Sequence, residues 1–255
     1  MTFPHVVALV AASIAAGVMN AMAGGGTILT YPTLLFLGES AIVANATSTI
    51  ALWPGGAASM WGYRREVATH RAWLKTLLVP SLLGGAAGSI LLLRTPEKAF
   101  ERLAPFLILF ATILFLAQGA VSRSSAARAA RPRSRGRFAA ALLFQFGVAV
   151  YGGYFGAGIG ILMLATLGFL GLSDIHAMNG LKNFFGMCIN AVAAAYFILR
   201  GAVEWRAALV MIAGAIAGGY GGARFARRIG KEKSRAAVAV IGFGIAILLF
   251  VRGIR

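Results

Sequence analysis

The chain has 255 residues, of which 59% are hydrophobic and 12% are charged, and its 24 Lys and Arg residues against 7 Asp and Glu give a net charge of +17. A mean hydropathy of +0.81 is too high for a soluble domain, which would expose a large apolar surface to water. The composition therefore argues against a soluble enzyme and predicts an all-α polytopic membrane protein.

Ten apolar segments follow one another along the chain. Eight are close to the ~20 residues that a helix needs to cross a bilayer, and two are shorter. In chain order, the sequence predicts long helices at 4–23, 42–62, 72–93, 100–120, 138–155, 178–199, 207–226 and 236–251, and short helices at 27–38 and 159–172. Residues 1–5 carry no Lys or Arg, so we expect the first segment to be a retained transmembrane helix rather than a signal peptide.

The same order of features occurs twice in the chain. Residues 1–120 hold a long helix, a glycine cluster, a short helix and three further long helices, and residues 138–255 hold the same series. Between them, residues 121–137 are basic and low in complexity, which is typical of a flexible cytoplasmic linker. Two interrupted copies of one membrane unit are typical of secondary transporters, in which the repeats are often inverted.

The basic residues are compatible with two topologies. If the short segments dip in and return, residues 64–75, the linker and the C-terminus share one side. If the short segments cross, the second repeat is inverted, and 64–75, 123–137 and 224–235 share a side. The second topology follows the positive-inside tendency better, so we expect it, with the N-terminus outside, while the first stays open. Basic residues at helix ends indicate orientation and contact with anionic membrane lipids rather than nucleic acid.

Each repeat has a glycine cluster directly before its short helix. Non-helical backbone inside a bilayer is tolerated only where it is buried in protein or lines a wet cavity. The free N–H groups at the start of the following helix favour an anion. We therefore interpret both clusters as substrate-binding backbone, formed by Gly24, Gly25, Gly26, Thr27, Gly156 and Gly158.

Close helix packing is the alternative interpretation of these glycines. It is the one that we prefer for the series Gly214, Gly218 and Gly222, whose spacing of four residues is typical of membrane helix contacts. Such series can also hold two copies of the chain together, so a homodimer is a second open alternative.

Lys182 lies well inside an apolar segment, and the only acid in that segment is Asp174. If Ser173 caps the helix, Lys182 is about 13 Å from its start. A cation inside a membrane needs a counter-charge or a function, and a mobile anion would supply the charge.

We expect Asn179, Asn183, Asn45 and Ser48 to contribute polar groups to the same site, since Asn45 stands opposite Asn179 and Ser48 opposite Lys182 in the two repeats. A structural ion pair or snorkelling is the alternative for Lys182, and a helix–helix hydrogen bond is the alternative for Asn20 as a substrate contact.

Three stretches resemble the sulfite exporter TauE/SafE family. The run Ala16 to Thr27, followed by Tyr31-Pro32, is similar to the opening signature of that family, and the runs Tyr151 to Gly160 and Asp174 to Asn183 are similar to its second-repeat signature. The resemblance covers nearly the whole chain. It implies a multi-pass permease of the inner membrane that moves sulfite, organosulfonates or other small organic anions, with a proton or ion gradient as driving force. The chain departs from the family where Met163-Leu164-Ala165 replaces a second Tyr-Pro pair.

We therefore expect a secondary transporter of small anions that works by alternating access as the two repeats rock, with protons or Na⁺ as the coupling ion. The sequence shows no paired acid–base set in its apolar segments, so we expect no catalytic residue, no metal and no cofactor. An anion channel and, less favoured, a membrane-embedded enzyme are the alternatives.

Overall fold

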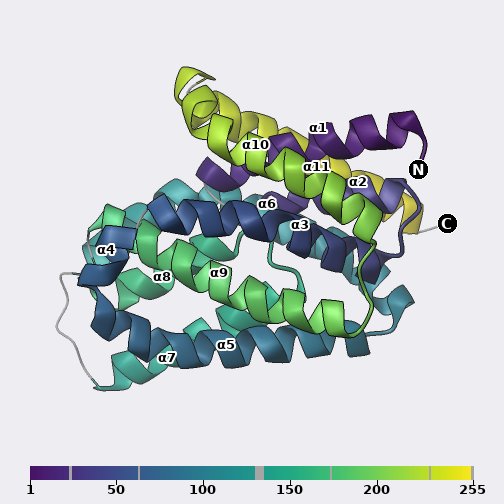
Figure 1. Ribbon diagram of the computed structural model, residues 1–255. Helices are drawn as coiled ribbons and strands as arrows, with labels where there is room; N and C mark the ends of the chain where they lie inside the picture. The colour runs from purple at the N-terminus through teal and green to yellow at the C-terminus, as the bar shows by residue number, and fades with distance from the viewer. Residues whose placement is uncertain (23–24, 63, 130–134, 173, 230, 254–255) are drawn as a thin grey trace.

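The computed structural model describes residues 1–22, 25–62, 64–129, 135–172, 174–229 and 231–253. Over these ranges the chain forms eleven helices and no strand (Figure 1). In chain order they are α1 (Phe3–Met22), α2 (Thr27–Phe36), α3 (Ala41–Gly62), α4 (Arg64–Thr69), α5 (Arg71–Arg94), α6 (Glu97–Ala129), α7 (Arg135–Tyr154), α8 (Ile159–Phe169), α9 (Ile175–Leu199), α10 (Trp205–Ile229) and α11 (Lys231–Gly253).

All ten expected helices are present, and the structure adds the short α4 between α3 and α5. One expectation is wrong in part: α6 continues through the first half of the segment that we expected to be a flexible linker, and it ends at Ala129. The physical reason is that residues 121–129 are rich in alanine and arginine, both of which have a high helix propensity. Residues 130–134 of that segment lie outside the described ranges.

By length and composition, four helical segments in the described ranges can cross a membrane: Phe3–Asn20, Arg71–Arg94, Glu97–Ala117 and His176–Leu199. Five shorter apolar helices accompany them, including α2, α8 and the apolar part of α7. The described residues thus form a bundle of apolar helices that combines long helices with the half-length helices α2 and α8.

The two halves contain broken helices at matching points. In Figure 1, α2 runs back toward the end of the bundle at which α1 begins, and α8 likewise runs back toward the end at which α7 begins. Each helix pair therefore turns near the middle of the bundle. The breaks come directly after α1 and α7, where the glycine clusters lie.

Helices α1 and α10 pack closely and run parallel. Gly218 of α10 lies against the backbone of Ile14, and Gly17 of α1 lies against the backbone of Ala215. A methyl group added at either glycine would overlap the facing helix, so this pair depends on small residues. The packing role that we expected for the glycine series of α10 is confirmed at Gly214, which faces Ser13, and at Gly218.

Helices α5 and α7 form a second parallel pair of the same kind. Gly84 of α5 faces Phe146, and Gly88 faces the backbone of Val150 and Tyr154. If the first half of the chain is matched to the second, α1 corresponds to α7 and α5 to α10. The two tightest pairs are therefore the same contact with the halves exchanged.

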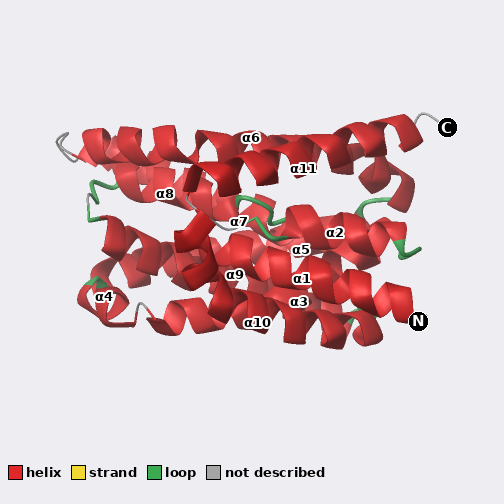
Figure 2. Ribbon diagram, turned by 90° about the horizontal axis from the view of Figure 1, so that it is seen from above, coloured by secondary structure: helices red, strands yellow, loops and turns green. Residues whose placement is uncertain are grey.

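Other contacts exchange in the same way. Helix α3 packs on α10 while α9 packs on α5, and the pair α1–α2 has its counterpart in α7–α8. Helices α3 and α9 contact each other, as do α6 and α11, which run side by side in Figure 2.

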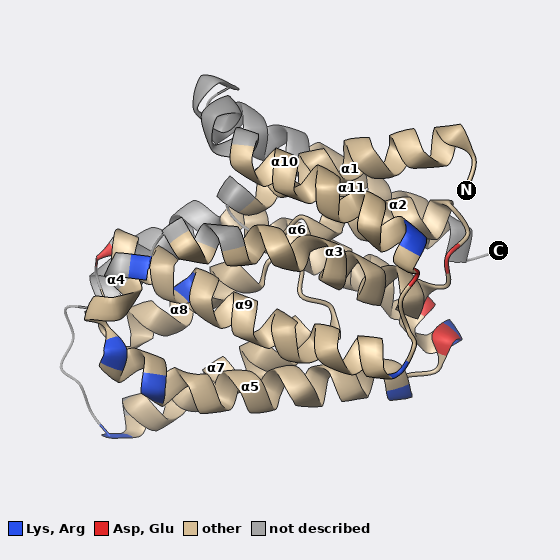
Figure 3. Ribbon diagram, in the orientation of Figure 1, with Lys and Arg blue, Asp and Glu red and all other residues tan. Residues whose placement is uncertain are grey.

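The described charged residues gather near the two ends of the bundle, with one exception on α9 (Figure 3). That exception is Lys182, since α9 contains no other Lys or Arg. At the end where α4 lies, the described basic side chains include Arg71 and Lys75 at the start of α5 and Arg135 at the start of α7. Toward the other end, Arg94 at the end of α5 is followed in the sequence by Glu97, and Arg206 at the start of α10 is preceded by Glu204.

Candidate functional site

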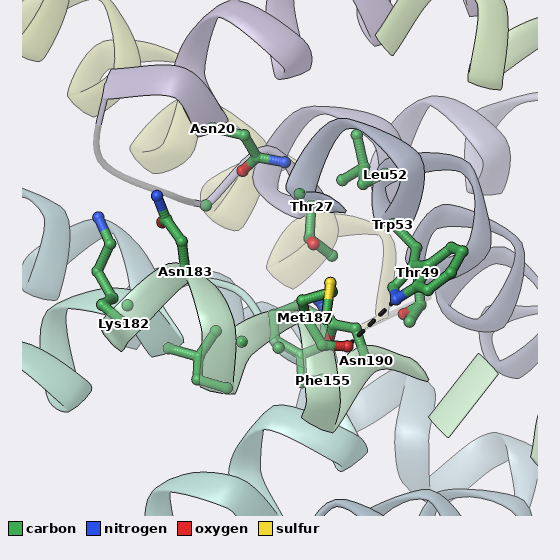
Figure 4. A pocket seen from close by; sticks show the side chains of 16 residues that line it. Asn20, Thr27, Thr49, Leu52, Trp53, Phe155, Lys182, Asn183, Met187 and Asn190 are labelled. Atoms are coloured by element: carbon green, nitrogen blue, oxygen red, sulfur yellow. Dashed lines mark hydrogen bonds between the residues drawn. The ribbon is translucent and has the colours of Figure 1, made fainter. Parts of the chain in front are cut away.

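A cavity of about 110 Å³ lies where the two helix breaks meet the middles of α3 and α9 (Figure 4). Because a single water needs only ~15 Å³ by this measure, the cavity has room for a small ion or molecule. Each of four regions contributes residues: Asn20, Gly25 and Thr27 at the first break; Thr49, Leu52, Trp53 and Gly56 on α3; Phe155, Gly156, Ile159 and Gly160 at the second break; and Lys182, Asn183, Gly186, Met187 and Asn190 on α9.

The first break is built around an asparagine that reaches back to the backbone. Gly25 has φ +107°, a conformation that L-residues with a side chain rarely adopt, and it turns the chain toward α2. The Gly26 N–H donates to Asn20 Oδ1 at 2.7 Å, so the side chain of α1 satisfies one of the free donors at the start of α2. Asn20 therefore makes a structural hydrogen bond and also lines the cavity.

The second break uses two left-handed glycines. Gly156 has φ +81° and Gly158 has φ +76°, and Gly158 is the residue that precedes the first turn of α8. Tyr151 Oη donates to the Ala157 carbonyl at 2.7 Å, which fixes the loop against α7. No side chain in the described ranges caps α8. Its first residues, Ile159 and Gly160, line the cavity, so the positive end of the α8 dipole lies at the cavity wall.

Lys182 brings the only charged side chain among the described residues that line the cavity. It is the eighth residue of α9, about 10 Å from the start of the helix, and only 8% of its surface is exposed. No described acidic residue forms an ion pair with it, and Figure 4 shows Lys182 and Asn183 side by side, pointing the same way. A buried cation without a protein counter-charge favours an anion at this position.

The helix that carries Lys182 begins at Ile175, three residues before the start of the predicted segment 178–199. The distance of about 13 Å given above depended on a cap at Ser173, but the cap is Asp174, whose side chain accepts a hydrogen bond from the His176 N–H at 2.9 Å. Ser173 itself lies outside the described residues. The Asp174 carboxylate is thus engaged at the helix start, two turns away from Lys182.

The two long walls of the cavity come from matching positions of the two halves. Trp53 and Met187, which are 134 positions apart, meet directly, since the Trp53 indole N–H donates to the Met187 carbonyl at 3.1 Å. At the same interval, Thr49 matches Asn183, Leu52 matches Gly186 and Gly56 matches Asn190. Lys182 breaks this correspondence, because its counterpart on α3 is Ser48, which does not line the cavity.

Six of the residues that the sequence indicated are brought together at the cavity: Asn20, Gly25, Thr27, Gly156, Lys182 and Asn183. Gly26 and Gly158 lie next to it, each as the residue before a short helix. Asn45, Ser48 and Asn179 do not line it, and Gly24 lies outside the described residues.

Asn45 and Ser48 have partners within the protein instead. The Asn45 amide nitrogen donates to the Tyr154 carbonyl at 3.0 Å, while the Ser48 hydroxyl pairs with the hydroxyl of Thr30 on α2. Ser48 is too short to reach the cavity from a position where the long side chain of Lys182 does reach it. These two residues therefore tie α3 to α7 and to α2.

Sequence reasoning missed several cavity residues, above all Thr49, Trp53 and Asn190. A signal was present in the match of Asn45 with Asn179. These two residues are 134 positions apart, and the same interval pairs Trp53 with Met187. It also pairs Gly56 with Asn190, which is an amide in the middle of an apolar helix. Among the described residues, no three His, Cys, Asp or Glu side chains come together as a metal site.

Comparison with known proteins gives related chains of similar length. A protein of Haemophilus influenzae described as "Probable membrane transporter protein" is 29% identical over 231 residues, which cover 89% of this chain and 88% of that protein. "Probable membrane transporter protein ORF9" of a Sinorhizobium species is 25% identical over 244 residues, 94% of this chain and 90% of that protein. "Probable membrane transporter protein YfcA" of Escherichia coli K12 is 27% identical over 234 residues, 89% of this chain and 82% of that protein.

No solved structure matches the chain. The profile of the family described as "Sulfite exporter TauE/SafE" matches residues 9–249, nearly the whole sequence. With its apolar helices and its helix breaks at one central cavity, the chain belongs to the sulfite exporter TauE/SafE family of membrane transporters.

Proposed function

We propose that the protein is a secondary transporter of small anions, such as sulfite, organosulfonates or small carboxylates, and that the cavity at the two helix breaks is its substrate site. The observation that carries the proposal is Lys182, a buried ammonium that lines the cavity and has no ion pair with a described residue. An anion bound there would compensate the charge and accept hydrogen bonds from Asn183 and Asn20.

The starts of the two short helices support an anionic substrate independently. Thr27 of α2 and Gly160 of α8 both line the cavity within the first turn of their helices, where unpaired N–H groups and the helix dipole attract negative charge. Half-length helices whose starts face the midplane of the membrane are a recurring way in which transporters bind an anionic group.

The exchanged contacts support inverted repeats and alternating access. The tight pairs α1–α10 and α5–α7 join helices from different halves, and α1 and α7 enter the bundle from opposite ends. The groups that move would therefore be α1, α2, α3 and α10 on one side and α5, α7, α8 and α9 on the other. They meet where α3 crosses α9, at the Trp53–Met187 hydrogen bond, so a small rotation there would open the cavity to either end of the bundle.

Charge supports an orientation in the inner membrane. In the sequence, the basic blocks 64–75, 123–137 and 224–235 fall at the junctions α3–α5, α6–α7 and α10–α11, and the described starts of α5 and α7 lie at the end of the bundle where α4 lies. By the positive-inside tendency this end faces the cytoplasm, and both termini face the other side. The driving force would be a gradient of protons or Na⁺, and anionic lipids would contact the basic junctions.

A flux assay in liposomes tests the proposal. Purified protein is reconstituted and the uptake of sulfite, sulfoacetate, taurine and lactate is compared with and without a proton or Na⁺ gradient. We expect uptake of at least one anion that depends on a gradient and shows counterflow, which an open channel would not give. Lys182→Ala should abolish uptake while inserting normally, and Lys98→Ala, at the exposed start of α6, is the matched control. Unchanged uptake by the Lys182 variant would overturn the anion site.

A further inference from the structure

The cavity has two chemically different ends, which Figure 4 shows on opposite sides of Thr27. Lys182 and Asn183 lie at one end, and Thr49, Trp53 and Asn190 gather at the other. Along α9, Lys182 and Asn190 are eight residues apart, about 12 Å of helix rise. A bare tetrahedral anion at Lys182 would therefore leave the second end unoccupied.

The second end is polar but carries no charge. Asn190 makes no hydrogen bond with any described residue, so its amide offers both donors and an acceptor to the cavity. Thr49 Oγ1 donates to the Asn45 carbonyl at 2.9 Å, which leaves its oxygen lone pairs free to accept. Trp53 is committed to the Met187 carbonyl, so its ring provides a fixed apolar side to this end.

We infer that Asn190 and Thr49 form a second subsite, which binds an uncharged hydrogen-bonding group on the anion whose charged group lies at Lys182. A hydroxyl suits both residues, because it can donate to Thr49 Oγ1 while it accepts from the Asn190 amide. The inference rests on the proposed function and adds to it the class of substrate: a monoanion with a short tail that ends in a neutral polar group.

The charge of the lining sets the opposite limit. Lys182 is the one charged side chain among the described lining residues, so a second negative group would lie against Asn190 and Trp53 without a counter-charge. Moving an uncompensated charge out of water is far more costly than moving a hydroxyl that finds partners. The subsite should therefore select against dianions of the same length.

Three two-carbon sulfonates test the subsite: isethionate, which has a hydroxyl on its second carbon; ethanesulfonate, which lacks that hydroxyl; and sulfoacetate, whose second carbon is a carboxylate. In the reconstituted protein we expect isethionate to be taken up with a KM about 3- to 10-fold lower than ethanesulfonate, as one net hydrogen bond allows. Sulfoacetate should have the highest KM of the three.

The decisive variant is Asn190→Leu, which keeps the size of the side chain and removes its amide. It should raise the KM for isethionate to that for ethanesulfonate. Asn183→Leu, the matched change at the charged end, should weaken uptake of all three sulfonates and leave their order intact. If Asn190→Leu does not fold, Thr49→Val must reduce the same preference.

The outcomes separate the two proposals. Equal KM values for isethionate and ethanesulfonate in the unaltered protein, or a preference that survives both Asn190→Leu and Thr49→Val, would overturn the second subsite alone. Absence of uptake for every anion tested would overturn the proposed function instead.

Discussion

The two helix breaks occupy matching places in the chain, yet each needs its glycine for a different reason. Gly26 and Gly158 both stand directly before a short helix. Gly26 has φ −53°, which any residue can adopt, but a Cβ there would lie 2.7 Å from the Ala16 carbonyl oxygen. Gly158 has φ +76°, but the nearest atom to its Cβ would be 3.6 Å away. Directly before the short helix, the first break requires a small residue and the second requires a left-handed one, whereas the left-handed glycine of the first break is Gly25.

The side chains that hold the breaks also differ. Asn20 accepts a hydrogen bond from a backbone N–H at the first break, whereas Tyr151 donates one to a backbone carbonyl at the second. In the described part of the chain, no side chain therefore accepts a hydrogen bond from the first N–H groups of α8. At the start of α2, by contrast, Asn20 accepts one from the Gly26 N–H. The comparison teaches that the α8 side of the cavity has more donor capacity left for an anion.

The largest effect is expected from Gly26→Ala. The added methyl group overlaps the Ala16 carbonyl oxygen, which is backbone and cannot rotate away, and it crowds the Asn20 amide, which is held by its hydrogen bond with the Gly26 N–H. We expect a loss of roughly 3 kcal/mol of stability, in the upper range for an overpacked core. Thermal unfolding in detergent measures it, and an unfolding midpoint within a degree of the unaltered protein would show that the first break can widen.

Asn20→Leu should come next. It leaves the Gly26 N–H buried without an acceptor, which costs roughly 1–3 kcal/mol, and it removes an amide from the cavity, so KM should rise as well. Tyr151→Phe is the matched change at the second break. Because Tyr151 does not line the cavity, it should lower the unfolding midpoint and leave KM unaltered. A rise in KM with Tyr151→Phe would mean that the two breaks do not differ in this way.

Gly158→Ala should be milder than Gly26→Ala, although both add the same methyl group. The left-handed backbone costs a residue with a side chain roughly 1–2 kcal/mol, and there is space for the methyl group itself. Gly158→Asn should recover part of that loss, because asparagine tolerates this conformation. At residue 26, Gly26→Asn should be as damaging as Gly26→Ala. The unfolding midpoints of the Ala and Asn variants at residues 26 and 158 check the comparison. It would be refuted if the Ala and Asn variants ranked in the same order at both positions.

The smallest effect concerns the loops that follow the short helices. In the loop after α8, the acidic residue Asp174 caps α9. In the loop after α2, the acidic residue is Glu39, and partial burial and the neighbouring Glu204 raise its pKa above the usual value. A raised carboxyl pKa means that the folded state holds its proton more tightly than the unfolded state. The corresponding stability is present in full below the unfolded pKa and is lost as pH rises through the folded pKa. The difference in unfolding midpoint between the unaltered protein and Glu39→Gln should therefore grow from mild acid to pH 7, whereas a constant difference would contradict the shift.

Much of the fold could be predicted because the membrane restricts it. Apolar length locates the helices, and the glycine clusters at 24–26 and 156–158 locate the breaks, since helix is otherwise the default in lipid. The extension of α6 to Ala129 could not be read from composition, because a stretch rich in alanine, serine and arginine has the charge of a linker and the propensity of a helix.

The site was predictable only in part, for reasons of geometry. Lys182 and Asn183 stand out as polar residues in an apolar segment, and both line the cavity. Asn45 stands out equally, but it lies one turn before Thr49 on α3, where its partner is the Tyr154 carbonyl. Whether a polar residue of a membrane helix meets a cavity or a neighbouring backbone depends on the crossing of α3 and α9, which no single segment encodes.

The parallel pairing of α1 with α10 has a consequence for how the protein folds during its synthesis and membrane insertion. Helix α1 leaves the ribosome long before α10, which carries the surface that the glycine face of α1 fits. Until α10 is inserted, that face has only lipid or a chaperone to cover it, so the tertiary structure cannot close stepwise from the N-terminus. A chain released early would leave α1 and α5 in place without α10 and α7, and the first half on its own should be a poor folding unit.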